Sequence, residues 1–125
     1  SSDGIQFAMA PSKEGTQLAQ IDIGSINGEE QVLMELSTNA ANIGPVEDAD
    51  FKMGREGNVT IYELKISWKD IFPDGYILRK NSSVPFSMLI NDNDGTGRRG
   101  YMENGGGLGS GIKNVYEFLD LFLLF

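Results

Sequence analysis

The 125-residue chain has no cysteine, no histidine and only one tryptophan. Without cysteine, it forms no disulfide and has no thiol chemistry. Without histidine, it lacks the usual general base near neutral pH and the commonest ligand of transition metals. These absences exclude a Ser-His-Asp triad and a histidine-ligated zinc site.

Positive charge is also scarce, since 10 Lys and Arg stand against 18 Asp and Glu and give a net charge of −8. A nucleic-acid backbone needs a basic protein face, and anionic lipid attracts basic segments. The longest apolar run, at the C-terminus, is far too short to span a bilayer. We therefore expect neither a nucleic-acid partner nor a membrane partner.

Glycine is abundant, at 16 residues, and no long segment has the 3.6-residue period of an amphipathic helix. Short alternating segments separated by turns predict an all-β protein, an antiparallel β-sandwich formed by one domain of residues 1–125. For residues 118–125 a strand is favoured over a short helix. Strands are predicted at residues 5–9, 18–23, 31–36, 49–53, 59–68, 84–90, 101–103 and 118–125.

Three local signals refine this prediction. Asn27-Gly28 is typical of a two-residue hairpin turn, and Ser67 is suited to cap a single helical turn that ends before Pro73. The alternation in residues 59–68 places Tyr62, Leu64 and Ile66 toward the core. Trp68 has two interpretations: a core residue at a corner of the sandwich, which is favoured, or a platform on which a ligand stacks.

Residues 86–111 carry most of the functional information. Asp92, Asp94, Thr96 and Glu103 have the spacing of a calcium-binding EF-hand loop. A true EF-hand needs helices on both sides, however, and the preceding residues read as a strand. Two hypotheses remain: a calcium ion held by Asp92 and Asp94 without the EF-hand fold, or a polar hairpin turn. The glycine-rich segment 105–111 lacks the lysine and the helix of a phosphate-binding loop.

Several segments together resemble family 9 carbohydrate-binding modules. The resemblance is carried by residues 61–68, 86–95, 97–103 and 105–113, and the opening residues 3–8 resemble the family's D-S-[IV]-[EQ]-[FI] strand. It implies a jelly-roll sandwich, sugar binding without catalysis, and structural metal ions, typically calcium. It also implies a secreted or cell-surface location, as a module of a bacterial protein that degrades or binds polysaccharide.

The resemblance also implies candidate sugar contacts. Arg98 matches a sugar-contacting arginine, and Gln6 stands where the family has a sugar-contacting glutamate. Two tryptophans hold the sugar in the family, and neither has a counterpart here. Tyr116 and Phe118 are aromatic candidates to replace them. The predicted site comprises Gln6, Arg98, Glu103 and Asn104 as hydrogen-bonding groups and Tyr101 as a stacking group. The alternative is a structural or interaction domain that has lost the sugar site.

The family has one or two strands before the strand that begins here near Asp3. A sandwich without them leaves an unpaired strand edge and an uncovered core face, which favours self-association. We therefore expect homodimerisation or strand exchange.

Overall fold

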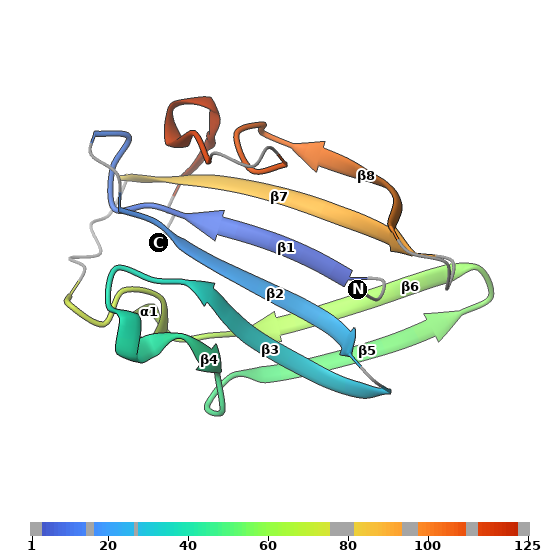
Figure 1. The fold of residues 1–125 in the computed structure, drawn as a ribbon. Helices are drawn as coiled ribbons and strands as arrows, with labels where there is room; N and C mark the ends of the chain where they lie inside the picture. The colour runs from blue at the N-terminus through green and yellow to red at the C-terminus, as the bar shows by residue number, and fades with distance from the viewer. Residues whose placement is uncertain are drawn as a thin grey trace.

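The computed structural model describes residues 4–14, 17–26, 28–75, 82–93, 98–109 and 113–122, and it forms two antiparallel β-sheets (Figure 1). The all-β, antiparallel fold predicted from the sequence is confirmed. The large sheet has the order β4-β3-β2-β1-β7-β8, with β9 also paired to β7, and the small sheet is the β5–β6 hairpin. No helix in the described segments has the length and apolar character needed to cross a membrane.

The elements have the following bounds: β1 Gly4–Met9, β2 Ala19–Ile26, β3 Glu29–Leu36, β4 Gly44–Pro45, β5 Asp50–Glu56, β6 Val59–Lys65, α1 Trp68–Ile71, β7 Ser83–Asn93, β8 Arg98–Asn104 and β9 Leu119–Phe122. Two short 3-10 helices, η1 Ala40–Asn42 and η2 Val115–Glu117, complete the set.

The local signals act as predicted. Ile26 pairs with Glu29, so the β2–β3 hairpin closes through two residues, of which Asn27 lies outside the described set and Gly28 has a φ of 82°. That left-handed conformation favours glycine. The Ser67 hydroxyl accepts a 3.1 Å hydrogen bond from the Asp70 amide and caps α1.

Some predicted boundaries are wrong. Strand β7 continues through Asn91 and Asp92 to Asn93, and β8 begins at Arg98, before the predicted start at Tyr101, so both strands are longer than predicted. Asn91 pairs with Gly4 on one side and with Tyr101 on the other. These ladder hydrogen bonds outweigh the low strand propensity of Asn and Asp. In the same way, β2 runs beyond its expected end at Gly24 because its ladder with β3 continues. The segment predicted as a loop after residue 36 contains η1 and β4.

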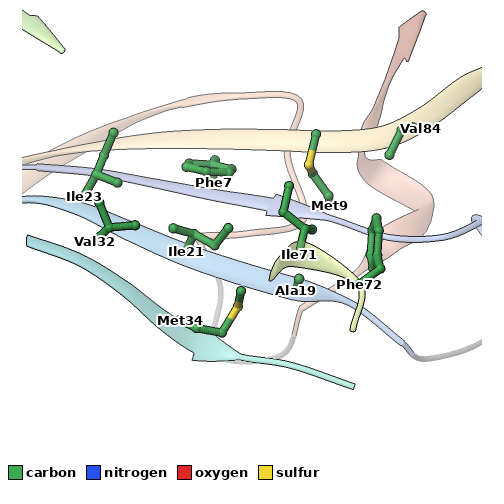
Figure 2. Close-up of a cluster of buried hydrophobic side chains, with 10 residues drawn as sticks. All are labelled: Phe7, Met9, Ala19, Ile21, Ile23, Val32, Met34, Ile71, Phe72 and Val84. Carbon is green, nitrogen blue, oxygen red and sulfur yellow. The ribbon is translucent and has the colours of Figure 1, made fainter. Parts of the chain in front are cut away.

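The main core lies between the large sheet and the layer formed by α1 and the β5–β6 hairpin. Alternate residues of β1, β2 and β3 point into it and meet Ile71 and Phe72 (Figure 2). Tyr62, Leu64 and Ile66 pack against this core, as predicted. Trp68 packs there too, and its ring stacks on Phe72 with centroids 6.3 Å apart. This contact supports the core interpretation of Trp68.

A second, smaller core covers part of the opposite face of the large sheet. Residues 105–109 and 113–118, which we call the cap, place apolar side chains over Ala8, Ala10 and Leu89. The cap contributes Leu108, Val115 and Phe118. Buried apolar residues therefore lie on both faces of β1 and β7, which makes these two strands the centre of the molecule.

One part of the core-side face is left uncovered. Met102 pairs with Ile90, and Leu119 and Leu121 pair with Phe86 and Val84, so all three point to the side of the main core. They are nevertheless exposed, Met102 by 68%. The small sheet lies toward β3, with which β5 is in contact, and it does not reach this edge (Figure 1).

Stability of the cap is expected to depend on Gly107. Its φ is 78°, and an added Cβ would collide with the Asn114 carbonyl oxygen. We expect Gly107→Ala to lower the free energy of unfolding by at least about 2 kcal/mol. Gly54→Ala is the matched control, because nothing lies within 4 Å of a Cβ there. Urea denaturation measures both variants, and equal effects would contradict this role of Gly107.

The uncovered edge predicts self-association. We expect the sedimentation coefficient of the chain to rise with concentration and Met102→Glu to reduce that rise. Ile43→Glu is the control, since Ile43 is 52% exposed but lies in the loop before β4. A coefficient that is independent of concentration would contradict the expectation, as would equal effects of the two substitutions.

Candidate functional site

The candidate site is a polar cluster on the face of the large sheet that carries the cap. Gln6 of β1 pairs with Asp22 of β2, and Gln20 lies two residues before Asp22 on the same strand. Their neighbours Phe7, Ile21 and Ile23 point into the main core. Because side chains alternate along a strand, the three polar residues point to the other face.

Asp22 is the centre of this cluster. Its Oδ2 accepts a 3.3 Å hydrogen bond from Gln6 Nε2, and its Oδ1 accepts a 3.2 Å hydrogen bond from Gln20 Nε2. Glu35 of β3 lies close enough to Asp22 for each carboxyl to shift the pKa of the other. Side chains of β1 and β2 are thereby fixed by a single carboxyl group, with a third strand contributing the neighbouring Glu35.

The electrostatics of the cluster favour protonation. Burial raises the pKa of Asp22, although hydrogen bonds from Gln20, Gln6 and Glu35 and the charge of Lys113 partly offset the effect. The pKa of Glu35 is raised by burial and by the nearby charge of Asp22. Carboxyls with raised pKa values that lie beside a second carboxyl are more common at functional sites than on ordinary strand surfaces.

Gln20 adds a second unusual feature. Its side chain is only 6% exposed, and its Oε1 has no hydrogen-bond partner among the described residues. A buried acceptor without a partner costs about 1–3 kcal/mol. The cluster is therefore not arranged for stability alone.

The predicted contacts Gln6 and Glu103 lie on this face in one row, since Gln6 pairs with Leu89 and Leu89 pairs with Glu103. Glu103, however, is already engaged. Its Oε1 accepts hydrogen bonds from the amides of Leu108 and Gly109 at 2.7 and 2.8 Å. Glu103 thus holds the cap in place, beside the cluster.

Asn104 is not brought to the cluster. It pairs with Met88, which packs against the main core, so its register position lies on the opposite face from Gln6. Tyr101 pairs with Asn91, and Arg98 begins β8. The side chains of Arg98 and Tyr101 lie outside the described part of the structure.

The two other aromatic candidates differ in exposure. Phe118 is 2% exposed and belongs to the small core under the cap, so it is not available for stacking. Tyr116 is 68% exposed and lies in η2 of the cap, whose Asn114 Oδ1 accepts a hydrogen bond from the Tyr116 amide. Tyr116 is therefore the exposed aromatic residue that the cap offers.

The spacing of Asp92, Asp94 and Glu103 does not form an EF-hand, because strands, β7 and β8, take the place of the two helices that an EF-hand needs. The side chain of Asp92 and the whole of Asp94 lie outside the described residues, so calcium binding by this pair stays a prediction. Across the described ranges, no group of three or more acidic side chains gathers as metal ligands.

A second polar region lies on the small sheet, where a hollow of about 450 Å³ is lined by Asp50, Lys52, Glu63, Leu64 and Lys65. Its charges are matched across the two strands: Asp50 pairs with Lys65, and Lys52 pairs with Glu63. Opposite charges in direct register satisfy one another, so this hollow is the weaker candidate.

Sequence reasoning missed Gln20, Asp22, Glu35 and Lys113. One signal was available: Gln20 and Asp22 alternate with Ala19, Ile21 and Ile23, which predicts a strand with one polar face. No local signal indicates that Gln6 and Glu35 join that face.

The raised pKa values lead to a testable dependence on pH. With raised values, the folded protein holds these protons more tightly than the unfolded chain does. This contribution to the free energy of unfolding is fully present at pH values below the ordinary pKa values, 3.8 for Asp22 and 4.5 for Glu35. It is lost as the pH rises through the raised pKa values of the folded protein. We expect Glu35→Gln to flatten this part of the curve of unfolding free energy against pH. Urea denaturation over a pH series measures it, with Glu30→Gln, outside the cluster on β3, as the control. Identical curves for Glu35→Gln and the unmodified chain would contradict the coupling.

Comparison of the chain with protein-family models, with curated proteins and with solved structures finds no match.

Proposed function

We propose that the chain is a non-catalytic carbohydrate-binding module and that Gln6, Gln20, Asp22 and Glu35 form its sugar site. One observation carries the proposal: on the face of the sheet away from the main core, the amide groups of Gln6 and Gln20, from two strands, are fixed on Asp22, and Glu35 of a third strand lies beside it. Sugar hydroxyls both donate and accept hydrogen bonds, and such groups can contact two neighbouring hydroxyls at once.

Preorganisation supports this function. A flexible surface side chain costs about 0.5–1.5 kcal/mol to immobilise when a ligand binds. Gln6 and Gln20 already donate to opposite oxygens of Asp22. These side chains are therefore already ordered in the free protein, so less conformational entropy is lost when a ligand binds. This favours a polar ligand of modest size.

The cap supplies the apolar contact that a sugar ring also needs. Tyr116 is exposed in η2, and an aromatic ring can cover the apolar face of a pyranose. Lys113, whose charge acts on Asp22, belongs to the same cap and donates from Nζ to the Leu108 carbonyl at 2.7 Å. The cap and the cluster therefore adjoin.

The resemblance to family 9 carbohydrate-binding modules points the same way. Gln6 is both a member of the cluster and the residue at the family's sugar-contacting position. In this proposal Arg98 and Tyr101 of β8 extend the site. A jelly-roll topology, a structural calcium ion near Asp92 and Asp94, and a secreted or cell-surface location in a bacterial protein belong to the same proposal.

The geometry favours binding over hydrolysis. A glycosidase needs two carboxyls about 5–10 Å apart on either side of the bond that it cleaves. Asp22 and Glu35 lie close enough together for each to shift the pKa of the other, an arrangement that favours a shared polar contact over two carboxyls on either side of a bond. Glu103, on the same face, is occupied by two cap amides.

The second candidate function is a structural or interaction domain. The exposed apolar side chains of Met102, Leu119 and Leu121 favour it, because apolar patches on a sheet face mark interaction surfaces.

A glycan array followed by calorimetry on the best ligand tests sugar binding. We expect Gln6→Ala and Asp22→Ala to weaken binding by about tenfold or more, since each removes a hydrogen bond to or from a charged group. Arg98→Ala is expected to weaken it as well. Asn104→Ala is the control, because its register position lies on the other face of the sheet.

Two results would overturn the proposal. One is an array on which no glycan binds the unmodified chain. The other is a bound glycan whose affinity falls as much with Asn104→Ala as with Asp22→Ala.

A further inference from the structure

The cluster has many hydrogen-bond acceptors and few donors. Asp22 and Glu35 contribute four carboxyl oxygens, while Gln6 and Gln20 each give an amide N–H to Asp22. Gln20 Oε1 is an additional acceptor, buried and without a partner among the described residues. Because the Gln20 amide lies directly against Asp22, its unused acceptor belongs to the same cluster.

Among the described residues, the positive charge that acts on Asp22 comes from Lys113. Lys113 of the cap lowers the pKa of Asp22 through its charge, but its Nζ also donates to the Leu108 carbonyl. The chain as a whole carries a net charge of −8. The charge of Asp22 raises the pKa of Glu35, so the two carboxyls repel each other when both are ionised, and a bound cation would relieve that repulsion.

We propose that this site binds sugars that carry a primary ammonium group, as in chains of glucosamine. The inference rests on the proposed function and names the substrate class of the same site. An ammonium group has three N–H donors and no acceptor, which is the complement of what the cluster presents. Its positive charge also balances the Asp22–Glu35 pair.

Other sugars are expected to bind more weakly than an ammonium sugar at this position. A neutral hydroxyl supplies one donor and no charge, so a neutral sugar binds more weakly at this position. An N-acetylated amine supplies one N–H and a bulky acetyl group, again without charge. A uronate brings a third carboxylate beside two others, and like charges without a counter-ion are destabilising.

Isothermal titration calorimetry with matched trisaccharides tests the inference. Cellotriose and the glucosamine and N-acetylglucosamine trimers share ring configuration and linkage and differ only at the second carbon. At a pH below the pKa of the amine, we expect the glucosamine trimer to bind about tenfold more tightly than cellotriose, the scale of one charged hydrogen bond. A glucuronate trisaccharide is expected to bind most weakly.

Two variants test whether the preference for the glucosamine trimer comes from the cluster or from general attraction of a cation to an acidic protein. Glu35→Gln is expected to abolish the preference for the glucosamine trimer. Glu30→Gln removes the same charge from the same strand, but Glu30 pairs with Ser25 near the hairpin turn and lies outside the cluster, so the preference is expected to persist. Thermal unfolding confirms that both variants are folded.

The outcomes distinguish the two proposals. Equal affinities for the glucosamine trimer and cellotriose, both weakened by Gln6→Ala, would overturn the ammonium preference and leave sugar binding in place. A preference that survives Glu35→Gln would also overturn it, because the charge would act from elsewhere. Failure of every trisaccharide to bind the unmodified chain would count against both proposals.

Discussion

The structure depends on burying both faces of its central strands. On β1, Phe7 points into the main core and its neighbour Ala8 lies under the cap. A strand that is packed against other elements on both faces can present exposed polar side chains only beyond the edge of one of these elements. The cap provides that boundary, since it reaches Leu89 but leaves Gln6 in the same row half-buried. Gln6 and Asp22 thus lie where the covering by the cap ends, whereas Gln20, which pairs with Ala8, is buried.

Half-burial beside the cap also explains the chemistry of the cluster. A carboxyl in open water would gain little from two amide hydrogen bonds, since water offers equivalents. A fully buried carboxyl would be neutral. Asp22 lies between these limits, with a raised pKa and hydrogen bonds accepted from Gln6 and Gln20 at 3.3 and 3.2 Å. Such a group is still reachable by a ligand and already oriented, which is what recognition of a polar molecule requires.

The sequence predicts those features whose causes are local. The alternation of apolar and polar residues predicts β1 and β6. The Asn27-Gly28 turn signal predicts the pairing of β2 with β3, and the capping residue Ser67 predicts α1. The site is harder to predict because its residues are brought together only by the register in which the strands pair. Gln20 pairs with Leu36 while Ile21 pairs with Met34, so Glu35 is the extra residue of a bulge. No sequence pattern marks a bulge at that residue. The sequence indicates Glu103 and the face of the sheet on which it lies. It does not indicate that Glu103 accepts hydrogen bonds from the amides of Leu108 and Gly109, because these depend on the path of the cap.

The uncovered apolar edge and the polar cluster lie on opposite faces of one sheet. Met102 and Leu119 share a side with the main core, whereas Gln6 and Asp22 share a side with the cap. Association through the apolar edge therefore leaves the cluster open, so the two proposed activities do not compete for the same surface. Two copies joined in this way would present two sugar sites. On a polymer with repeating sugars, the second contact forms at a high effective concentration, and weak individual sites become a strong combined one. The proposed sugar site, which lacks the paired tryptophans of family 9 modules, would gain most from this arrangement, because their stacking would not contribute to the affinity of a single site.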